Sequence, residues 1–245
     1  MIDASTKWYE LAPNIAKDAF DDIRRQYPLK DGRRIVLKYS GHLKNYNSNA
    51  RYNADKIEFS LSNQWKDVDA DIQKGLIQSL IIRVFKIRNV ETENMKLYES
   101  FMKNLSKYAK KHTQDPELSL SFDRVNGKYF NGMMDKPNLI FASESFSKLG
   151  SYEYGTDTIH ISTIFHELPE DDVKYLDYVM YHELLHKKHS FNVKNGRHQA
   201  HTTAFRNDER NFAHGIDMEK QLSAFLRRKI YSKAKGSMKE WFRMW

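Results

Sequence analysis

Two histidines stand four residues apart with a glutamate directly after the first: His182, Glu183 and His186. The segment 170–189 has the apolar spacing of a helix, and an α-helix brings positions i and i+4 to one face. Two imidazoles on one face can bind a single tetrahedral zinc ion at about 2.0–2.1 Å each. Glu183 would then lie beside the ion, where it can hold a water and take its proton. The helix therefore predicts a hydrolytic zinc site.

A catalytic zinc usually has three protein ligands and leaves one position to water. We expect His201 to be the third ligand, because it lies at or near the start of the next predicted helix, 199–213. Phe205, one turn later, would pack beneath it. The alternatives are His189, His198 and Glu209. A third ligand on the same straight helix would have poor geometry, which counts against His189.

These residues resemble a known family. Tyr181 to His186, then fourteen residues, then His201-Thr202-Thr203-Ala204-Phe205 is similar to the SprT/Spartan-like metallopeptidase domain, which has an HExxH helix and a third histidine in an H-x-x-x-F motif. Leu149 to Tyr152 and Ile159 to Ser162 look like the strand region of that family. The resemblance covers about residues 117–215.

The resemblance implies a zincin-like α+β fold, in which helices pack on a small mixed sheet. It also implies zinc as cofactor, His182, His186 and His201 as its ligands, and Glu183 as the catalytic acid/base. The implied substrates are DNA-associated or DNA-crosslinked proteins. The chain differs from many members in having Thr202 where they have glycine, and without cysteine it cannot form the zinc ribbon of bacterial members.

The expected activity is hydrolysis of peptide bonds by a metal-activated water, with Glu183 as general base. A peptide substrate would add as an extra strand beside Thr158–Ser162. One alternative is a zinc-containing DNA-binding module without catalysis. Glu183 counts against that alternative, because a structural zinc site needs no base. Another alternative is a zinc hydrolase that acts on non-peptide substrates.

The order helix, strand, loop, strand, helix, helix occurs twice along the chain. The first copy comprises 14–27, 34–39, 56–61, 69–87 and 93–111, and the second 117–130, 138–141, 158–162, 170–189 and 199–213. A gapless shift of 102 residues superposes nine identical residues. They are Phe20, Asp21, Tyr27, Leu37, Tyr52, Asp55, Ile57, Ser60 and Asp69. We therefore predict two tandem related halves.

The shift replaces every polar group of the metal motif by an aliphatic one. His182, Glu183 and His186 fall on Leu80, Ile81 and Val84, and His201 falls on Leu97 when the last helix is shifted by two more residues. A site that lost its metal would fill with aliphatic residues, because burying an unliganded imidazole is costly. We predict a degenerate metal-free repeat at 1–112, a metallopeptidase domain at 113–215 and a basic, aromatic tail at 216–245.

Net charge is +8, and the C-terminal tail holds most of the excess. Its cations Arg227, Arg228, Lys229, Lys233 and Lys235 alternate with aromatic residues, Phe225, Tyr231, Trp241, Phe242 and Trp245. Cations pair with phosphates and aromatic rings stack on bases, so the tail predicts a contact with DNA. The alternative is an amphipathic terminal helix whose aromatic residues pack on the body of the protein.

The composition excludes other classes of protein. The chain has no cysteine, so it has no disulfide and no thiolate zinc site. No apolar run approaches the roughly 18 residues of a membrane-spanning helix, so we expect no membrane partner. The first residues have no apolar segment typical of a secretory signal, which predicts a cytoplasmic protein.

Overall fold

A computed structural model of the chain describes residues 15–27, 29, 31–109, 114–191, 193–213 and 215–243, without the side chains of 108, 198, 215–216 and 236–243. The chain divides into two compact units. Unit 1 comprises the described residues up to Asn104 together with Phe191–Gln199, and unit 2 comprises Leu105–Ser190 and the described residues from Ala200. Both units contain helices and a small mixed sheet, so the predicted α+β class is confirmed.

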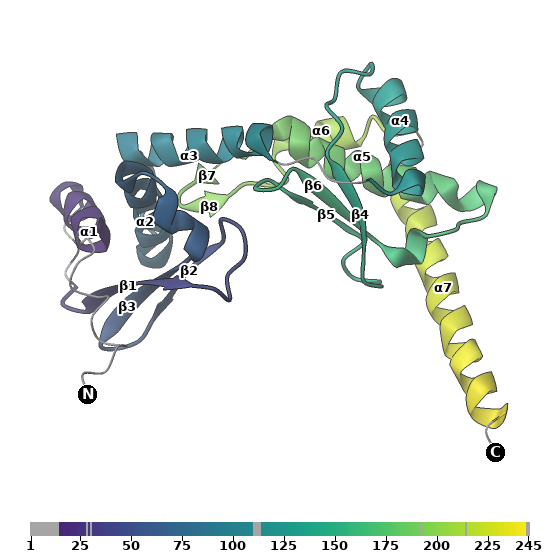
Figure 1. The fold of residues 1–245 in the computed structure, drawn as a ribbon, viewed down its shortest axis with the longest axis horizontal. Helices are drawn as coiled ribbons and strands as arrows, with labels where there is room; N and C mark the ends of the chain where they lie inside the picture. Colours follow the sequence, from purple (N-terminus) through teal and green to yellow (C-terminus); the bar gives the residue numbers. More distant parts are fainter. Residues whose placement is uncertain are drawn as a thin grey trace. The chain divides into compact units, whose positions relative to one another are not determined.

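Unit 1 consists of helices and strands that Figure 1 labels. They are α1 (Ile15–Gln26), β1 (Arg34–Ser40), β2 (Ser48–Tyr52), β3 (Lys56–Ser62), α2 (Ala70–Phe85), α3 (Glu93–Leu105), β7 (Val193–Lys194) and β8 (Arg197–His198). The sheet has the order β1-β3-β2, with β3 parallel to β1 and antiparallel to β2. Strands β7 and β8 form a separate antiparallel hairpin.

Unit 2 carries the predicted metal motif. Its elements are α4 (Pro116–Tyr129), β4 (Asn138–Ala142), β5 (Gly150–Glu153), β6 (Thr158–Ser162), α5 (Val173–His189), α6 (Thr203–Glu209) and α7 (Gly215–Arg243). The sheet has the order β4-β6-β5, with β6 parallel to β4 and antiparallel to β5. Because β6 is paired on both sides, no substrate strand can add beside it, and the prediction that one adds at Thr158–Ser162 is wrong. The edge next to α5 is formed by β5.

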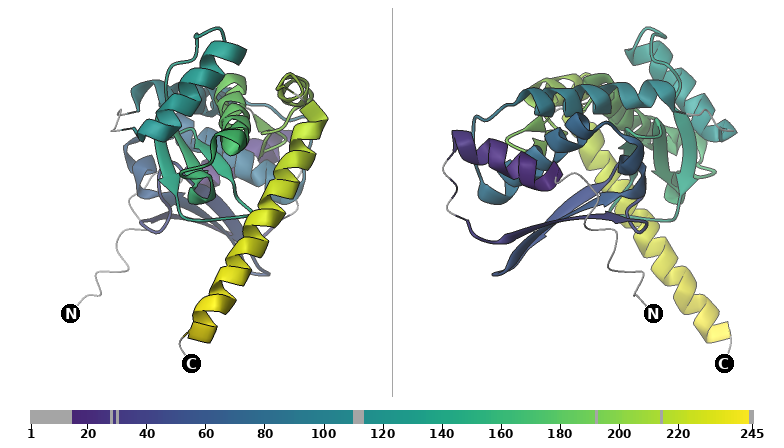
Figure 2. Two further views of the ribbon diagram at one scale, coloured as in Figure 1. Left: turned by 90° about the vertical axis from the view of Figure 1, so that its right-hand side faces the viewer. Right: turned by 60° about the vertical axis from the view of Figure 1, so that its left-hand side comes forward.

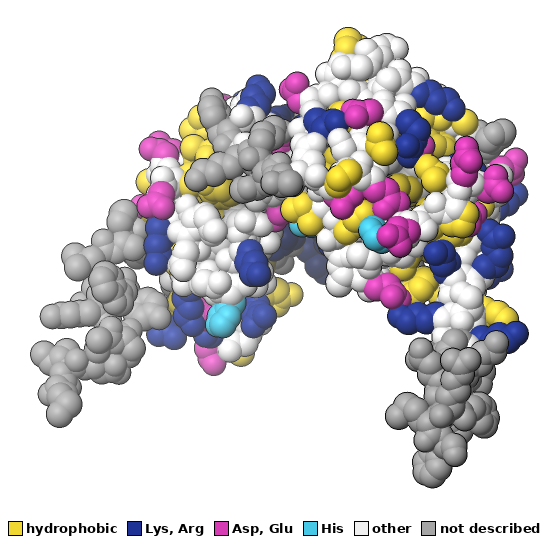
Figure 3. Space-filling view, turned by 45° about the vertical axis from the view of Figure 1, so that its right-hand side comes forward, with side chains coloured by type: hydrophobic (Ala, Val, Ile, Leu, Met, Phe, Trp, Pro, Cys, Tyr) yellow, Lys and Arg dark blue, Asp and Glu magenta, His cyan; other side chains and the backbone are white. Residues whose placement is uncertain are grey.

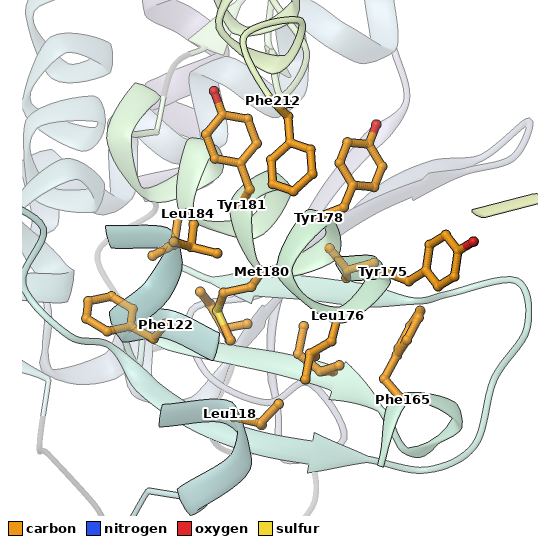
Figure 4. Close-up of a cluster of buried hydrophobic side chains, with 14 of the residues drawn as sticks. Leu118, Phe122, Phe165, Tyr175, Leu176, Tyr178, Met180, Tyr181, Leu184 and Phe212 are labelled. Carbon is orange, nitrogen blue, oxygen red and sulfur yellow. The ribbon is translucent and has the colours of Figure 1, made fainter. Parts of the chain in front are cut away.

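The core of unit 2 lies around α5 (Figure 4). Leu176 and Met180 of α5 face the sheet, and Leu118 and Phe122 of α4 complete that layer; all four are at most 2% exposed. Burying such side chains contributes about 1.5–3 kcal/mol each. The helix α4 begins at a clear signal, since Asp115 accepts hydrogen bonds from the next turn and Pro116 takes the first helical position.

A buried polar network also ties α5 to the sheet. Lys187 Nζ lies 2.7 and 2.8 Å from the two carboxylate oxygens of Asp157, and Tyr152 donates its hydroxyl proton to the same carboxylate over 2.8 Å. Asp157 is 2% exposed, so its charge needs these partners. The network fixes the last turns of α5 against the turn between β5 and β6.

The helix α7 begins within the fold of unit 2 and runs on beyond it (Figure 2). Met218, Leu222 and Phe225 are buried, and the ring of Phe225 stacks on Phe165 and Tyr175 at centroid distances of 5.9 and 4.6 Å. Phe225 is therefore a core residue and cannot stack on a base, as the tail prediction required. The side chains of Trp241, Phe242 and Trp245 lie outside the described residues.

The two units have the same strand order, the same strand directions and the same order of the first helix, sheet and second helix. Their central strands correspond: Ile57 pairs with Ile35 and Tyr52, and Ile159 pairs with Leu139 and Tyr152. These pairings equate Tyr52 with Tyr152 and Ile35 with Leu139. A single gapless shift therefore fits the central strands and misplaces both neighbouring strands by two residues.

Most predicted elements agree with the structure, but several differ, and the predicted helix 93–111 ends earlier, at Leu105. The strand β2 and the β7–β8 hairpin were not predicted, whereas β5 lies at the segment Leu149 to Tyr152 that resembles the strand region of the family. The predicted helix 199–213 is shorter, because α6 begins only at Thr203. Within the described residues no helix is both long enough and apolar enough to cross a membrane.

Candidate metal centre

Three histidines converge at one side of α5. Among the described residues, His182, His186 and His201 form the group whose ligand atoms all lie within 4.8 Å of one another. The first two lie one turn apart on α5, as their spacing predicted. The ring of His201 completes a triangle, with centroid distances of 5.2 Å to His182 and 4.9 Å to His186.

The spacing of the nitrogen atoms suits a tetrahedral ion. The Nε2 atoms of His182 and His201 are 3.3 Å apart. Two bonds of 2.0–2.1 Å at the tetrahedral angle place their nitrogen atoms roughly 3.4 Å apart. Three neutral imidazoles without a thiolate are a donor set that zinc accepts in catalytic sites. The residues present therefore fit a zinc ion with one position open.

Phe205 forms the apolar floor of this group. Its ring centroid lies 5.2 Å from that of His182 and 4.8 Å from those of His186 and His201, and the side chain is fully buried. The packing predicted between Phe205 and His201 is confirmed. His201 itself lies before α6 and not within it, because Thr202 caps the helix by accepting the backbone N–H of Phe205 over 3.2 Å.

Glu209 contacts the outer side of the group. Its Oε1 lies 2.6 Å from Nδ1 of His182, so the proton on Nδ1 points to the carboxylate and the lone pair of Nε2 points to the other histidines. Burial lowers the pKa of His182, but the hydrogen bond to Glu209 and the negative charges of Glu183, Glu209 and Glu219 together outweigh burial, so the net pKa is raised. The same bond lowers the pKa of Glu209. Glu209 thus contacts one of the three candidate ligands and lies outside the histidine group.

Glu183 lies beneath the sheet edge and is nearly inaccessible. Its side chain is 5% exposed, and burial raises its pKa from 4.5 to about 7, against the opposing effects of His182, the backbone N–H of Tyr152 and Lys148. A carboxyl group with a pKa near neutrality can both accept and return a proton. A cation at the three histidines would lower this pKa and favour the carboxylate.

Gly150 allows the strand β5 to approach Glu183. A Cβ atom at position 150 would lie 2.7 Å from Glu183 Oε1, 3.0 Å from its Cγ and 3.0 Å from Val179 Cγ1. The first of these distances is shorter than any ordinary contact. The absence of a side chain at Gly150 therefore lets the sheet edge and the carboxylate lie side by side.

The outer edge of β5 faces Glu183, to which the backbone N–H of Tyr152 donates a hydrogen bond. Leu149 accepts from Ser162 over 2.9 Å, and the alternation of an antiparallel ladder then turns the main chain of Gly150 and Tyr152 away from β6. A cavity of about 420 Å³ adjoins this edge. Its walls include Val179, Glu183 and Leu222. An extended peptide could pair with β5 and place a side chain in this cavity.

The other predicted candidates lie elsewhere or outside the described atoms. His189 pairs with Asp208, its Nε2 lying 2.9 Å from Oδ2, and it does not belong to the histidine group. The side chain of His198 lies outside the described residues. Sequence reasoning did not find Gly150 or the role of Glu209. The signal for Glu209 was its position two turns after His201, on the face that also carries Phe205.

The cations predicted to contact DNA lie on α7 (Figure 3). Arg227, Arg228 and Lys235 are exposed, while Lys229 lies with Nζ 5.6 Å from the ring centre of Phe225. Lys233 contacts Glu144 and Arg228 lies 3.7 Å from Asp172, so parts of this cluster are paired within unit 2.

No protein-family model matches the chain, and no curated protein or solved structure matches it either.

Proposed function

We propose that this protein is a zinc-dependent endopeptidase of the SprT/Spartan-like type with a zincin-like fold. The proposal rests on one observation above all: the three histidines have ligand atoms within 4.8 Å of one another, and a buried glutamate directly follows the first of them along α5. A structural metal site has no need of Glu183, whereas hydrolysis requires a base beside the attacking water.

Bound zinc supplies Lewis-acid chemistry, polarising the scissile carbonyl and activating a water. The chain supplies the remaining functions. Glu183 accepts the proton of the attacking water and returns it to the leaving amine, a task that suits a carboxyl whose pKa is about 7 before the metal binds. Glu209 holds His182 in the tautomer with a free Nε2. The edge of β5 binds the peptide in extended form beside Glu183.

The first test is zinc per chain, measured by elemental mass spectrometry on the wild type and on His201→Ala. We expect about one zinc per wild-type chain and weaker binding in the variant. Glu183→Gln should keep its zinc and lose cleavage of an unfolded protein substrate. Cleavage at the wild-type rate by Glu183→Gln would overturn the mechanism. Zinc binding without any proteolysis would instead favour a non-catalytic zinc-containing DNA-binding module.

We further propose that the exposed cations of α7 bind DNA and bring the peptidase to DNA-bound proteins. The support is the gathering of exposed Arg and Lys side chains on the part of α7 that follows Phe225. Changing the exposed Arg227 and Lys235 together to alanine should weaken binding to duplex DNA and reduce its salt dependence. Peptide cleavage without DNA should stay the same. Unchanged DNA affinity would refute this part of the proposal.

We also infer that unit 1 is a copy of unit 2 that has lost the metal site. The support is the shared strand order and the aliphatic residues that the 102-residue shift places opposite the metal motif in α2. Leu80 and Ile81, which replace His182 and Glu183, are 3% and 0% exposed. Such a unit no longer performs chemistry and is free to serve a supporting function.

A further inference from the structure

The chain between the second and third histidines of the metal centre belongs to the other unit. Fourteen residues separate His186 from His201. Of these, Phe191–Gln199 belong to unit 1, while Ser190 and Ala200 belong to unit 2. The chain leaves α5 at Ser190, whose φ of 56° turns it sharply, and it returns only one residue before His201.

Residues 193–198 of this segment form a β-hairpin with a defined strand pairing and turn. Val193 pairs with His198 and Lys194 with Arg197 through their backbones. Asn195 and Gly196 form the turn, with φ values of 52° and 69°. Asn-Gly is the preferred sequence for a two-residue turn in which both φ angles are positive. The hairpin is therefore encoded locally.

The turn of the hairpin packs directly against the backbone of α2. A Cβ atom at Gly196 would lie 2.1 Å from the carbonyl oxygen of Ser79 and 3.0 Å from the backbone nitrogen of Arg83. Asn195 Oδ1 accepts the backbone N–H of Asn89 over 3.0 Å. At the entrance to the hairpin, Phe191 is 8% exposed and meets the ring of Tyr98 edge to face at 5.7 Å. Residues of α2 and α3 and the segment after α2 thus contact the hairpin both where it begins, at Phe191, and at its turn.

His201 has a secure support on its C-terminal side only. Thr202 and Phe205 fix the start of α6, but His201 lies outside that helix and its side chain is exposed. The backbone before His201 is Ala200, preceded by the hairpin. A free loop from Ser190, where α5 has ended, to Ala200 would leave many positions for this ligand, and closing such a loop on the metal is entropically unfavourable. Holding the hairpin within this loop removes most of that freedom.

We propose that unit 1 is a positioning element for the third zinc ligand, and that Gly196, Asn195 and Phe191 are its positioning residues. The inference rests on the proposed zinc site, and it gives unit 1 a function in metal binding. Unit 1 holds the hairpin, the hairpin fixes the chain before His201, and His201 in turn completes the metal site. The metal affinity of unit 2 is therefore set in part by packing inside unit 1.

The test compares two glycines with positive φ in the full chain. Gly196→Ala places a Cβ against α2, whereas Gly132→Ala, at φ 72° in unit 2, has nothing within 4 Å of its Cβ. Zinc affinity is measured by competition with a chromophoric chelator. We expect the zinc Kd of Gly196→Ala to rise roughly tenfold or more, the loss typical of a disturbed ligand support. Gly132→Ala should stay within about twofold of wild type, since its strain does not touch this support.

A second comparison separates positioning from general damage. In a His201→Ala background, Gly196→Ala should change the zinc Kd no further, because the hairpin acts only through His201. Asn195→Ala, which removes one hydrogen bond and no backbone contact, should raise the Kd by a smaller factor and keeps the test valid if Gly196→Ala unfolds unit 1. Near-ultraviolet circular dichroism monitors the fold of each variant.

The outcomes distinguish the two proposals. A wild-type chain that binds no zinc would overturn the metal site and the positioning role together. A wild type that binds zinc, with Gly196→Ala and Asn195→Ala at the same affinity, would overturn the positioning role alone. An equal loss of affinity with and without His201 would overturn it as well.

Discussion

At the scale of single residues, each side chain that is proposed to act at the metal is oriented by a neighbouring group. His182 is held by Glu209 from behind and faces His201 in front. Glu183 is positioned instead by burial and by close contact with the backbone of β5. Orientation therefore comes from a carboxylate in the first case and from close packing in the second.

Replacing Glu209 by glutamine tests the first of these supports. The amide can still accept from Nδ1 of His182 but carries no charge, so the imidazole becomes a poorer donor to a cation. Loss of an outer-shell carboxylate typically weakens metal binding about 10–100-fold. We expect Glu209→Gln to weaken zinc binding within this range in a chelator competition. If Glu209→Gln binds zinc as tightly as the wild type does, the contact with Glu209 does not orient His182 for metal binding.

Glu183 has a predictable effect on the stability of the metal-free protein. Its pKa is about 7 in the folded chain and 4.5 as an ordinary carboxyl, so the folded state holds more protons between these values. Stability must therefore fall as pH rises from about 4.5 to 7. In EDTA, Glu183→Gln should be more stable than wild type at pH 8, by up to about 3 kcal/mol, and no more stable at pH 4. Urea unfolding at both pH values measures this, and a gain independent of pH would contradict it.

The HExxH residues and His201 could be predicted from spacing because one α-helix dictates which residues share a face. The choice of His201 over its rivals depended on a resemblance and on Phe205. Spacing places Glu209 on the face that carries Phe205, but its contact with His182 could not be predicted, because the contact depends on how α6 approaches α5. Helix crossings are set by tertiary packing and leave no fixed spacing in the sequence.

At the scale of elements, the approach of β5 to α5 defines the site. The strand and the helix meet at a glycine, so that a main chain and a carboxylate lie closer than any side chain would permit. Gly150 is therefore a structural requirement of the arrangement. It fixes where an extended substrate would lie relative to Glu183.

The change Gly150→Ala tests that requirement. The added methyl must displace Glu183 or Val179, since its nearest contact would be 2.7 Å. A displacement of this size at a catalytic base lowers the rate by roughly tenfold to a hundredfold, while the histidines keep the metal. Steady-state cleavage together with zinc content measures both effects. The control is Gly127→Ala, where nothing lies within 4 Å, and it should retain full activity.

The helices α2, α4 and α5 and the strands β1, β3, β4 and β6 could be predicted from their residue patterns, whereas β2 could not and the segment of β5 was indicated only by the family resemblance. The strands β3 and β6 alternate apolar and polar residues because one face is buried. The sequence of β2, Ser48–Tyr52, and of β5, Gly150–Glu153, shows no such alternation, and both strands are only partly buried or exposed. Pairing with a neighbour holds them in place, and pairing leaves little trace in composition.

At the scale of the whole molecule, the two units are linked by more than one covalent connection. The chain passes from unit 1 to unit 2 near residue 104, returns for the hairpin and passes back before His201. If the folded hairpin strengthens zinc binding, bound zinc must stabilise the folded hairpin by the same free energy, because binding couplings are reciprocal.

Zinc should therefore protect the hairpin, although the hairpin belongs to unit 1. In hydrogen–deuterium exchange, we expect zinc to slow the exchange of the hairpin amides of residues 193–198 in the wild type. Amides of β1 and β3 should exchange at the same rate with and without zinc. In His201→Ala the protection of the hairpin should disappear. Protection that persists in this variant would mean that zinc acts on the hairpin by another route.

The returning hairpin also sets the order in which the protein can be completed on the ribosome. The first 104 residues of unit 1 emerge early, but the hairpin that finishes the unit follows 95 residues later. At a synthesis rate of about 5–20 residues per second, the hairpin is completed roughly 5–20 seconds after the rest of unit 1. The helix with His182 and His186 is made during that interval, and His201 follows the hairpin directly. His201 of unit 2 is thus synthesised only after the last residue of unit 1, so a nascent chain has no complete group of three histidines while unit 1 is still unfinished.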